Sequence, residues 1–599
     1  MSPRRTKQPP IADYAVLADR QTSALLAHGS VDWMCVPQFD SASVFSRLLS
    51  DPDESHWSIV PTDGTERSRH YREGSFVLDT TWTTPTGAAK CTDFMPIREG
   101  EGDDPVLDNT VALIRSIECT EGEIDVDHEL VIRFDYGLTA PWIRQARTND
   151  GNHVLLAVAG PNSLALYGPR LQAGDRRHSG HFHIRAGQKL TWTLMWRPSY
   201  RPIMDAPDMD AELERTINHW REWHSNLSND GIYSEAVERS LSVLRALTLH
   251  RTGGIVAAVT TSLPEAIGGQ RNWDYRYTWL RDSAFTISAL SRHGHHTVAR
   301  QWRDWLLRAL AGDPEDVQIM YTIEGQRQLP EHTLDQLQGY RGSKPVRVGN
   351  GAVDQYQADV IGEVLISLAH LRDDGLDEDD FSWSLQVSLL EHLRKQKNVK
   401  DQGMWESRGE PHYYTHGRVM MWAAFDRGVE AIERYGLQGP LDEWRQERDA
   451  LREEIMSKGV KDGYFVQHYD TLAVDASALQ IPQTGFIAYD SDIMLATVDR
   501  IEKELMTEQG FVRRYVADGS DGFSSQEGAF LMCTFWLVEQ YARSGRPEDG
   551  KLLMDKLMTA GNDLQLFSEE YEPSTGEMLG NFPQAFSHLA LIRAADAVG

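Results

Sequence analysis

Two short acidic segments, far apart in the chain, carry the residues that could do chemistry. Glu406 follows Trp405 between two glycines, and Glu569 stands beside Glu570 about 160 residues later. Cleavage of an acetal needs one carboxyl group that donates a proton and one carboxylate that activates water on the opposite face. If the fold brings Glu406 and Glu569 to opposite sides of one pocket, they form such an acid/base pair.

The environment of Glu406 favours the role of proton donor. An apolar neighbour such as Trp405 raises the pKa of a carboxyl group by shielding it from water. Glu410, four residues further on, is a competing acid. Taken alone, a Trp-Glu pair is more often a surface carboxylate beside a core tryptophan, so this segment does not decide the function by itself.

A third segment, Arg271–Asp282, combines four aromatic residues with arginine and aspartate side chains. Aromatic rings stack on the apolar face of a sugar, while carboxylate and guanidinium groups pair with its vicinal hydroxyls. The alternative is a buried ion-pair network, Arg281 with Asp282 and Asp274 with Arg276, that holds two domains together. From these residues alone both interpretations stay open.

Composition and charge narrow the class of protein and its partners. A chain of 599 residues predicts two or three domains, and 41% hydrophobic with 25% charged residues is typical of a globular protein. The formal charge of −29 argues against nucleic acid or an anionic membrane as the main partner. There is no apolar stretch long enough to span a bilayer and no apolar run after Arg4 and Arg5.

The four cysteines are widely scattered, which argues against a zinc site or a disulfide scaffold; they are Cys35, Cys91, Cys119 and Cys533. The acidic stretch Asp373–Asp380 lacks the spacing of an EF-hand and is expected to be a solvated loop. His293–His296 lies between two predicted helices, where an exposed turn is favoured over a metal site. We therefore expect a cytoplasmic enzyme with no metal.

The pattern of apolar residues differs between two parts of the chain and predicts a β-rich part followed by a helical one. From Ile11 to Arg201, short alternating runs rich in β-branched and aromatic residues predict an antiparallel β-sandwich. A linker with a helix over Asp210–Ser225 follows. The expected domains are residues 1–205, a linker region over 206–230, and a catalytic domain over 231–599.

The catalytic part contains eleven amphipathic segments with apolar residues at three- and four-residue spacing. A possible twelfth lies near Asp475–Leu479. Twelve helices that close as six pairs would form an (α/α)6 barrel. The segments are Tyr233–His250, Asp282–Arg292, His296–Leu310, Gln355–Leu371, Ser382–Gln396, Arg418–Tyr435, Leu441–Ser457, Ser491–Leu505, Glu527–Arg543, Pro547–Ala560 and Ala585–Ala597.

Taken together, these motifs resemble glycoside hydrolase family 15, the inverting glucoamylase and trehalase family. The resemblance covers nearly the whole chain and is closest to the bacterial trehalase-like members. It is carried by Arg271–Asp282, Gly403–Gly409 and Ser568–Gln584, and further by Pro10–Tyr14, Gly29–Trp33, Pro37–Ser41, Thr260–Glu265, Pro345–Gly351 and Gly580–His588.

The resemblance implies a role for individual residues. Glu406 would be the general acid and Glu569 the general base, with Glu570 in its place if the alignment slips by one. Arg281 and Asp282 would grip the non-reducing glucose, with Trp279 and Trp405 nearby. Weaker correspondences leave substrate contact and loop structure equally open for Asn350, Gln355, His416 and Glu527.

The function expected from the resemblance is hydrolysis of an α-glucoside with release of β-glucose, the two carboxyls lying roughly 6.5–9.5 Å apart to admit a water. Trehalose, a small-molecule carbohydrate, is the expected substrate. A glucoamylase or glucodextranase acting on α-1,4 or α-1,6 glucans, a disaccharide phosphorylase, and a sugar-binding protein without activity are the alternatives. No cofactor is required, dependence on phosphate or magnesium stays open, and the sequence sets no oligomeric state. The Gly29–Ser41 segment either closes the pocket or only supports packing.

Overall fold

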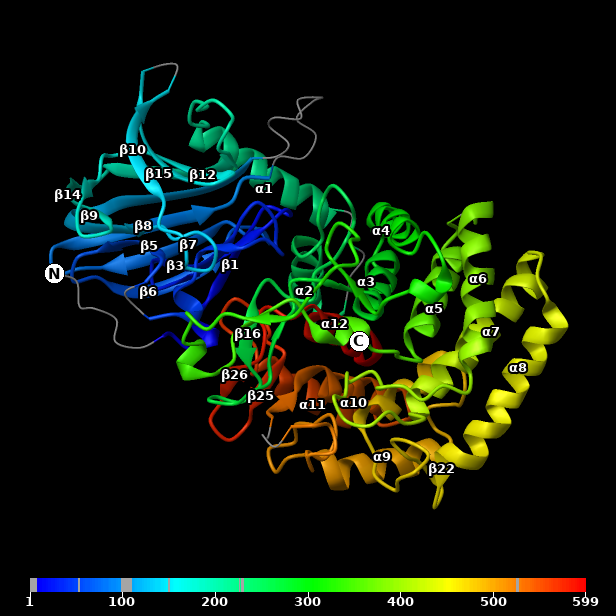
Figure 1. The fold of residues 1–599 in the computed structure, drawn as a ribbon. Coiled ribbons are helices and arrows are strands. Elements are labelled where there is room, and N and C mark those ends of the chain that lie inside the picture. The colour runs from blue at the N-terminus through cyan, green and yellow to red at the C-terminus, as the bar shows by residue number, and fades with distance from the viewer. Residues whose placement is uncertain are drawn as a thin grey trace.

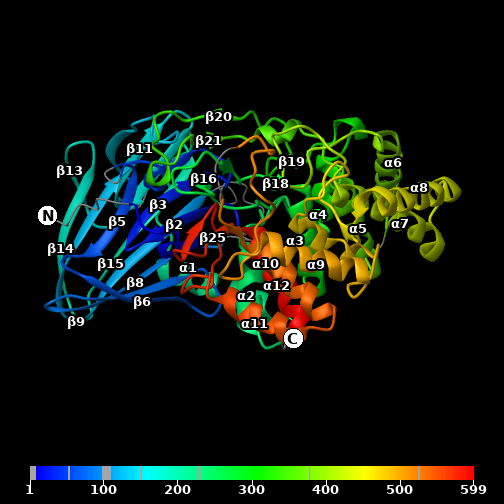
Figure 2. The same cartoon turned by 90° about the horizontal axis from the view of Figure 1, so that it is seen from below.

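The computed structural model describes residues 8–51, 54–97, 110–148, 151–225, 227, 231–376, 378–523 and 527–599. Arg4 and Arg5, Asp377 of the acidic stretch, and parts of the expected linker lie outside these residues. Figure 1 and Figure 2 show an N-terminal β-rich part beside a C-terminal helical part. The helix expected in the linker is α1 (Met209–Ser225), which follows the last strand of the β-rich part.

The N-terminal part is an antiparallel β-sheet domain, as the alternating runs predicted. Its central strand order is β1-β2-β3-β5-β9-β15-β12-β11-β10, and the remaining strands pair at its sides. The strands are β1 (Ala15–Ala18), β2 (Ser23–Ala27), β3 (Ser30–Cys35), β4 (Ser43–Phe45), β5 (His56–Pro61), β6 (Thr65–Tyr71), β7 (Leu78–Thr83), β8 (Gly87–Phe94), β9 (Val111–Val131), β10 (Trp142–Arg147), β11 (His153–Ala159), β12 (Asn162–Tyr167), β13 (Gln172–Ala173), β14 (His178–Arg185) and β15 (Lys189–Pro198).

Strand β9 joins two groups of strands because it is 21 residues long. Its first half pairs with β8 and β15, and its second half pairs with β5 and β14. The two halves meet at Gly122, which has a φ of +66° and lies so close to the neighbouring strand that a Cβ would come within 2.1 Å of the Thr86 carbonyl oxygen. Glycine is required there because any side chain would clash.

All eleven predicted helical segments of the C-terminal part are helices, with ends that shift by a few residues. The twelfth, near Asp475, is the short 3-10 helix η7 (Ala476–Gln480). The helices are α2 (Ser234–Ala246), α3 (Leu280–Arg292), α4 (His296–Ala309), α5 (Val360–Asp373), α6 (Asp380–Gln396), α7 (Thr415–Tyr435), α8 (Leu441–Glu454), α9 (Asp492–Leu505), α10 (Leu531–Arg543), α11 (Pro547–Met558) and α12 (Ala585–Val598).

Six of these segments contact one another in a closed ring. Around the ring α3 packs on α5, α5 on α7, α7 on η7, η7 on α10, α10 on α12, and α12 on α3. A second helix lies against each member: α4 against α3, α6 against α5, α8 against α7, α9 against η7, α11 against α10, and α2 against α12. The ring helices α5, α7, α10 and α12 are buried over most of their length, whereas α8 and α11 bury only a stripe. This burial follows from their apolar content, since a helix that is apolar on most sides needs neighbours on most sides.

Short strands of two to four residues lie in the loops of the helical part, and their pairing holds these loops in place. They are β16 (Thr261–Pro264), β17 (Asn272–Asp274), β18 (Thr278–Trp279), β19 (Met320–Tyr321), β20 (His332–Thr333), β21 (Arg347–Val348), β22 (Val460–Lys461), β23 (Tyr464–Phe465), β24 (Ala529–Phe530), β25 (Glu570–Glu572) and β26 (Glu577–Leu579). Within the described part of the chain, no helix has the length and apolar character that crossing a bilayer requires.

Buried polar contacts join the two parts. The Arg276 side chain has no exposure; it pairs with Asp274 at 2.7 Å and donates to the Ser41 carbonyl oxygen at 2.7 Å and to the Tyr136 hydroxyl at 2.9 Å. The Trp33 indole donates to the Val259 carbonyl oxygen at 2.9 Å. The ion-pair interpretation of the Arg271–Asp282 segment therefore holds for Arg276 and Asp274.

Candidate active site

A cavity of about 710 Å³ opens at the N-terminal ends of the ring helices α3, α10 and α12. Residues 271–282, 404–408 and 514–523 supply most of its wall, and the starts of α10 and α12, together with Ala257, Glu265 and Asn350, supply the rest. All described lining residues belong to the helical part, and none comes from the Gly29–Ser41 segment. That segment supports packing, because Ser41 accepts a hydrogen bond from buried Arg276.

Glu406 lies in this cavity on a loop that is held from several sides. Its backbone has a φ of +59°, a left-handed conformation that costs a non-glycine residue about 1 kcal/mol or more. The side-chain amide of Gln355 donates to the Glu406 and Ser407 carbonyl oxygens at 3.3 and 3.0 Å. The Arg408 N–H donates to the Asp521 carbonyl oxygen at 3.0 Å. These contacts hold the loop in the strained conformation that presents Glu406 to the cavity.

The Glu406 carboxyl group has two polar neighbours from the start of α3. The Trp279 indole nitrogen donates to Glu406 Oε1 at 2.6 Å, and Arg281 Nη2 lies 3.8 Å from the same oxygen. Burial raises the pKa of Glu406 above its usual value, and the charge of Arg281 and the Trp279 hydrogen bond oppose that rise. A raised pKa suits a group that must hold a proton at neutral pH.

Arg281 and Asp282 form a buried pair at the floor of the cavity. Arg281 Nε donates to Asp282 Oδ1 at 2.9 Å, and Nη1 donates to the Met404 carbonyl oxygen at 2.6 Å. The Arg281 side chain therefore fixes both the start of α3 and the loop that carries Glu406. The remaining N–H groups of the Arg281 guanidinium and Oδ2 of Asp282 can form hydrogen bonds with hydroxyl groups of a ligand.

Glu569 is fully buried, just before β25, and differs sharply from Glu406. Its Oε2 accepts a hydrogen bond from the Asn581 N–H at 3.1 Å, while its Oε1 has no hydrogen-bond partner among the described residues. Glu569 itself is not a lining residue, but Tyr275, whose side chain interacts with the Glu569 carboxyl group, is. Burial and the charge of Glu265 raise the pKa of Glu569 to about 8, against the opposing effect of Tyr275, Arg514 and the Asn581 N–H.

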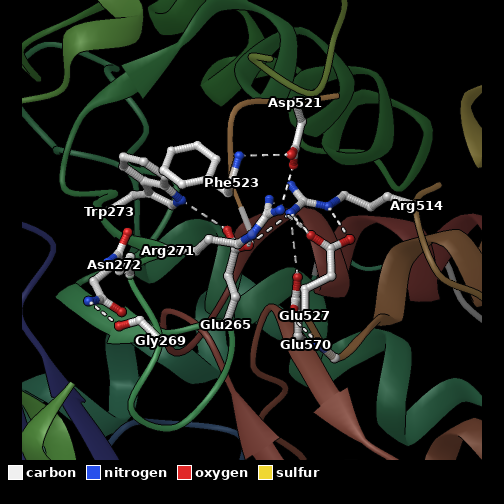
Figure 3. A network of polar contacts seen from close by, with 12 residues as sticks. Glu265, Gly269, Arg271, Asn272, Trp273, Arg514, Asp521, Phe523, Glu527 and Glu570 are labelled. Atoms are coloured by element: carbon white, nitrogen blue, oxygen red, sulfur yellow. Dashed lines mark hydrogen bonds and ion pairs between the residues drawn. The ribbon is translucent and has the colours of Figure 1, made fainter. Parts of the chain in front are cut away.

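Figure 3 shows a network of buried charges around Arg514 that includes Glu570, the residue after Glu569 in the chain. Arg514 Nη2 lies 2.9 Å from Glu265 and 2.5 Å from Glu527, and 3.8 Å from Glu570. Arg514 thus offsets three carboxylates that would otherwise repel one another in a medium of low dielectric constant.

Arg271 connects this network to the loop opposite Glu406. Arg271 Nη2 lies 2.5 Å from Asp521 Oδ2 and Nη1 lies 3.3 Å from Glu527. The Tyr515 hydroxyl donates to Asp521 Oδ2 at 2.8 Å, and the Trp273 indole donates to Glu265 Oε1 at 3.0 Å. The loop around Asp521 is therefore anchored both to the charge network and, through its backbone, to the loop that carries Glu406.

The structure brings some of the other predicted site residues into the cavity and leaves others outside it. Trp279, Trp405, Asn350, Arg281 and Asp282 are lining residues. Three are not among the lining residues: Gln355, which supports the Glu406 loop, His416, which is buried in α7, and Glu527, which pairs with Arg514. The competing acid Glu410 is exposed and does not line the cavity.

Sequence reasoning did not single out Glu265, Tyr275, Arg514 or Asp521 as site residues. Tyr275 lay within the segment Arg271–Asp282, and Glu265 ended the recognised segment Thr260–Glu265, so both were visible as positions without a role. Arg514 and Asp521 gave no local signal, because they pair with Glu265 and Arg271, which are distant in sequence.

Among the residues that the structure describes, two groups of side chains have ligand atoms close enough for a metal ion: His412 with His468 and Asp470, and Glu265 with Glu527 and Glu570. In the second group the guanidinium of Arg514 already supplies the positive charge. The histidines of His293–His296 have other contacts, since His293 lies 3.3 Å from Asp596 and His295 stacks on Trp223.

Comparison with known proteins agrees with these features over the whole chain. The family "Glycosyl hydrolases family 15" matches residues 231–558 and 548–596, and the family "Trehalase-like, N-terminal" matches residues 4–175. A trehalase of Mycobacterium tuberculosis is 35% identical over 99% of this chain and 90% of its own length. A trehalase of Thermoplasma volcanium is 33% identical over 98% of this chain and 93% of its own length.

Among solved structures, a bacterial glucoamylase complexed with acarbose is similar in fold. It aligns with a TM-score of 0.74 at 13% sequence identity and covers 100% of this chain and 96% of its own. An identity this low speaks for the fold alone, and the fold that it supports is an antiparallel β-sheet domain followed by a helical part.

Proposed function

The chain belongs to family 15 of the glycosyl hydrolases, and on that premise we propose that it hydrolyses α,α-trehalose with inversion, releasing β-glucose. The similarity to trehalases along nearly the entire chain is the observation that carries the choice of substrate. A disaccharide also suits the cavity, because aromatic rings and charged side chains line it together.

As part of this proposal the helical part is an (α/α)6 barrel over residues 231–599, with a β-sandwich over 1–205 and a linker over 206–230. The closed ring of α3, α5, α7, η7, α10 and α12, each backed by a second helix, supports the barrel. In this arrangement the ring helices direct their N-terminal loops into one central pocket, which explains how residues 300 positions apart in sequence meet there.

In the proposed mechanism Glu406 is the general acid. It donates its proton to the glycosidic oxygen as the bond to the anomeric carbon breaks and positive charge develops on the sugar ring. Burial raises the pKa of Glu406 and so favours its protonated form. Once the proton has left, the Trp279 indole and Arg281 stabilise the carboxylate that remains.

Glu569 is the proposed general base. It takes a proton from a water that attacks the anomeric carbon from the face opposite the leaving group, which inverts the configuration. No described residue hydrogen-bonds to its Oε1, which can accept that proton, and Oε2 is held by the Asn581 N–H. Burial and the charge of Glu265 raise the pKa of Glu569 to about 8, and the interaction with Tyr275 and the charge of Arg514 oppose that rise, toward the ionised form that a base needs.

Binding of the non-reducing glucose is assigned to Arg281 and Asp282, with Trp279 and Trp405 as apolar surfaces and Asn350 at the wall. Three further residues do not contact the sugar in this proposal: Gln355 supports the Glu406 loop, His416 is buried in α7, and Glu527 belongs to the charge network. Two carboxyl groups and a water suffice for this chemistry, so we propose that no cofactor is needed.

We also propose a cytoplasmic setting, where a small disaccharide is available. All four cysteines are free and buried, as expected for a protein of a reducing compartment.

The test is incubation with trehalose, maltose, isomaltose and panose, with glucose and its first-formed anomer followed by NMR. The proposal expects trehalose to be cleaved fastest and one of its two glucose products to appear first as the β-anomer. Parallel reactions with added phosphate, magnesium or EDTA identify a dependence on either ion. Faster cleavage of maltose or isomaltose would make the enzyme a glucan exo-hydrolase, and glucose 1-phosphate as product would make it a phosphorylase.

The variants Glu406→Gln and Glu569→Gln test the two roles. Loss of a positioned acid or base costs about 10²–10⁴-fold in turnover. Glu410→Gln is the matched control, because Glu410 is exposed and lies outside the cavity. A Glu569→Gln enzyme with nearly normal turnover would remove Glu569 from the role of base, and Glu570→Gln would then be the next variant to measure.

A further inference from the structure

The candidate active site has residues assigned to one glucose of a disaccharide, at the floor of the cavity, and none to the other. Exposure of the side chains shows which way the cavity opens: it is 9% at Arg281 and Asp282, 19% at Glu406 and 30% at Arg408. All four residues line the same cavity. With one glucose at Arg281 and Asp282 and the glycosidic oxygen at Glu406, the second glucose lies further toward the mouth, on the side of Arg408.

The side chain of Arg408 is held in place although it is partly exposed. Its guanidinium carbon lies 5.0 Å from the centre of the Trp273 ring, and Trp273 also lines the cavity. Its Nη2 donates to Glu331 Oε2 at 3.1 Å. A Cβ on Gly351 would come within 3.0 Å of Arg408 Nη1, so glycine at this position leaves room for the guanidinium. An arginine that is already held in one conformation loses little side-chain entropy when it binds a ligand.

The backbone of Arg408 is held as well, by the loop that carries Asp521. The Arg408 N–H donates to the Asp521 carbonyl oxygen at 3.0 Å. A Cβ on Gly409 would come within 2.0 Å of the Ser520 carbonyl oxygen, and one on Gly522 would lie 3.3 Å from the Arg408 carbonyl carbon. Two glycines therefore allow the two loops to lie directly against each other, and this contact fixes where the Arg408 side chain begins.

The guanidinium of Arg408 keeps hydrogen-bond donors for a ligand. Glu331 accepts from Nη2, and Nε and Nη1 have no hydrogen-bond partner among the residues that the structure describes. A guanidinium is a planar group that only donates, and sugar hydroxyls can accept. Burial raises the pKa of Glu406, and the charge of Arg408 is among the effects that oppose this rise, so the guanidinium lies near the acid.

From these observations we propose that Arg408 binds hydroxyl groups of the leaving glucose, and that Trp273 and Glu331 hold its guanidinium in the orientation that this contact needs. The inference rests on the proposed function, because it takes trehalose as the substrate. Arg408 contacts the glucose that departs and not the ring that reacts with water. It therefore promotes cleavage of a disaccharide and has little effect on a single sugar with a small leaving group.

The test compares trehalose with α-D-glucosyl fluoride, which carries one glucose and has fluoride in place of the second. The measured quantity is kcat/KM of the full-length protein for each substrate, from the release of glucose and of fluoride. Arg408→Met removes the donors but keeps a long side chain. We expect kcat/KM for trehalose to fall about 10- to 100-fold, as the loss of hydrogen bonds to a charged group predicts, and the value for the fluoride to stay within about threefold.

Two further variants separate this contact from other effects. Arg408→Lys keeps a positive charge near Glu406 but replaces the planar donor group by a point charge, so kcat/KM for trehalose should stay at least about fivefold below that of the wild type. Arg347→Met is the matched control, because the Arg347 guanidinium also lies over the Trp273 ring, at 4.4 Å, but Arg347 does not line the cavity. It should change both substrates by the same factor. The Tm of each variant checks its folding.

Equal losses for trehalose and the fluoride in folded Arg408→Met would overturn the inference and leave the proposed function in place, and so would an unchanged value for trehalose. Full recovery in Arg408→Lys would also overturn it, because an effect of charge on Glu406 would then explain the loss. A wild-type protein that hydrolyses the fluoride but not trehalose would refute the proposed substrate, and the inference with it.

Discussion

Replacing Trp279 by phenylalanine should move the basic limb of the pH–rate profile to higher pH. The indole nitrogen of Trp279 donates to Glu406 Oε1 at 2.6 Å, and this hydrogen bond favours the ionised carboxylate. Phenylalanine keeps an aromatic ring but has no donor. Without the donor the protonated form of Glu406 gains relative to the charged form, so the pKa of Glu406 rises and the acid stays protonated to higher pH.

The expected size of the shift follows from the hydrogen bond. A hydrogen bond to a charged group contributes about 1.5–3 kcal/mol, and one to the neutral carboxyl contributes about 0.5–1.5 kcal/mol. The difference of about 1–1.5 kcal/mol corresponds to about one pKa unit. The Glu406 side chain is 19% exposed, so solvent screens this interaction only in part.

The assay is kcat/KM for trehalose between about pH 5 and pH 9, because this ratio reports the pKa values of the free enzyme. Trp273→Phe is the matched control, since the Trp273 indole lines the same cavity but donates to Glu265 at 3.0 Å. The control should leave the basic limb in place. A basic limb in Trp279→Phe that stays fixed or moves to lower pH would refute the assignment of Glu406 as the acid that sets it.

Three further changes test the network and the scaffold. Glu265→Gln removes a charge that raises the pKa of Glu569. The pKa of Glu569 should therefore fall, and the acidic limb of the kcat/KM profile should move to lower pH. An acidic limb that does not move would show that Glu265 does not influence the group that sets it. Gly580→Ala should lower kcat at least tenfold, because a Cβ there would come within 2.4 Å of Glu569 Oε2, while Gly576→Ala, also at a positive φ, should leave kcat nearly unchanged. Arg276→Met leaves its buried carboxylate partner unpaired and should cost about 3–5 kcal/mol in urea denaturation; a loss below about 1 kcal/mol would mean that the pair is not a structural link.

The helical part was predictable from sequence because its signal is local. Apolar residues at three- and four-residue spacing mark each amphipathic helix, and all eleven segments were found with ends that shift by a few residues. The Gln355–Leu371 segment differs most from its predicted helix, which begins only at Val360 because the preceding residues are irregular. Gln355 is held there by contacts to the Glu406 loop, which no periodicity reveals.

The site was predictable only where function leaves compact motifs. Arg281, Asp282 and Glu406 stand in short segments with distinctive neighbours, and the structure places all three in one cavity. Arg514 and Asp521 could not be predicted, because each gains its meaning from partners about 250 residues away. The strained backbone of Glu406 was likewise hidden, since a glutamate gives no sign of a left-handed conformation.

Tyr275 and Arg276 are adjacent in sequence, but their side chains contact different parts of the molecule. Tyr275 faces the cavity and contacts Glu569, while Arg276 is buried against residues of the β-sheet domain. The backbone between Tyr275 and Arg276 therefore separates the cavity from the β-sheet domain. Contacts with that domain hold this backbone in place, although none of its described residues lines the cavity. A truncated chain without the β-sheet domain would keep every residue proposed to contact the sugar. It would lose the contacts of Arg276 that hold the neighbouring Tyr275 in place.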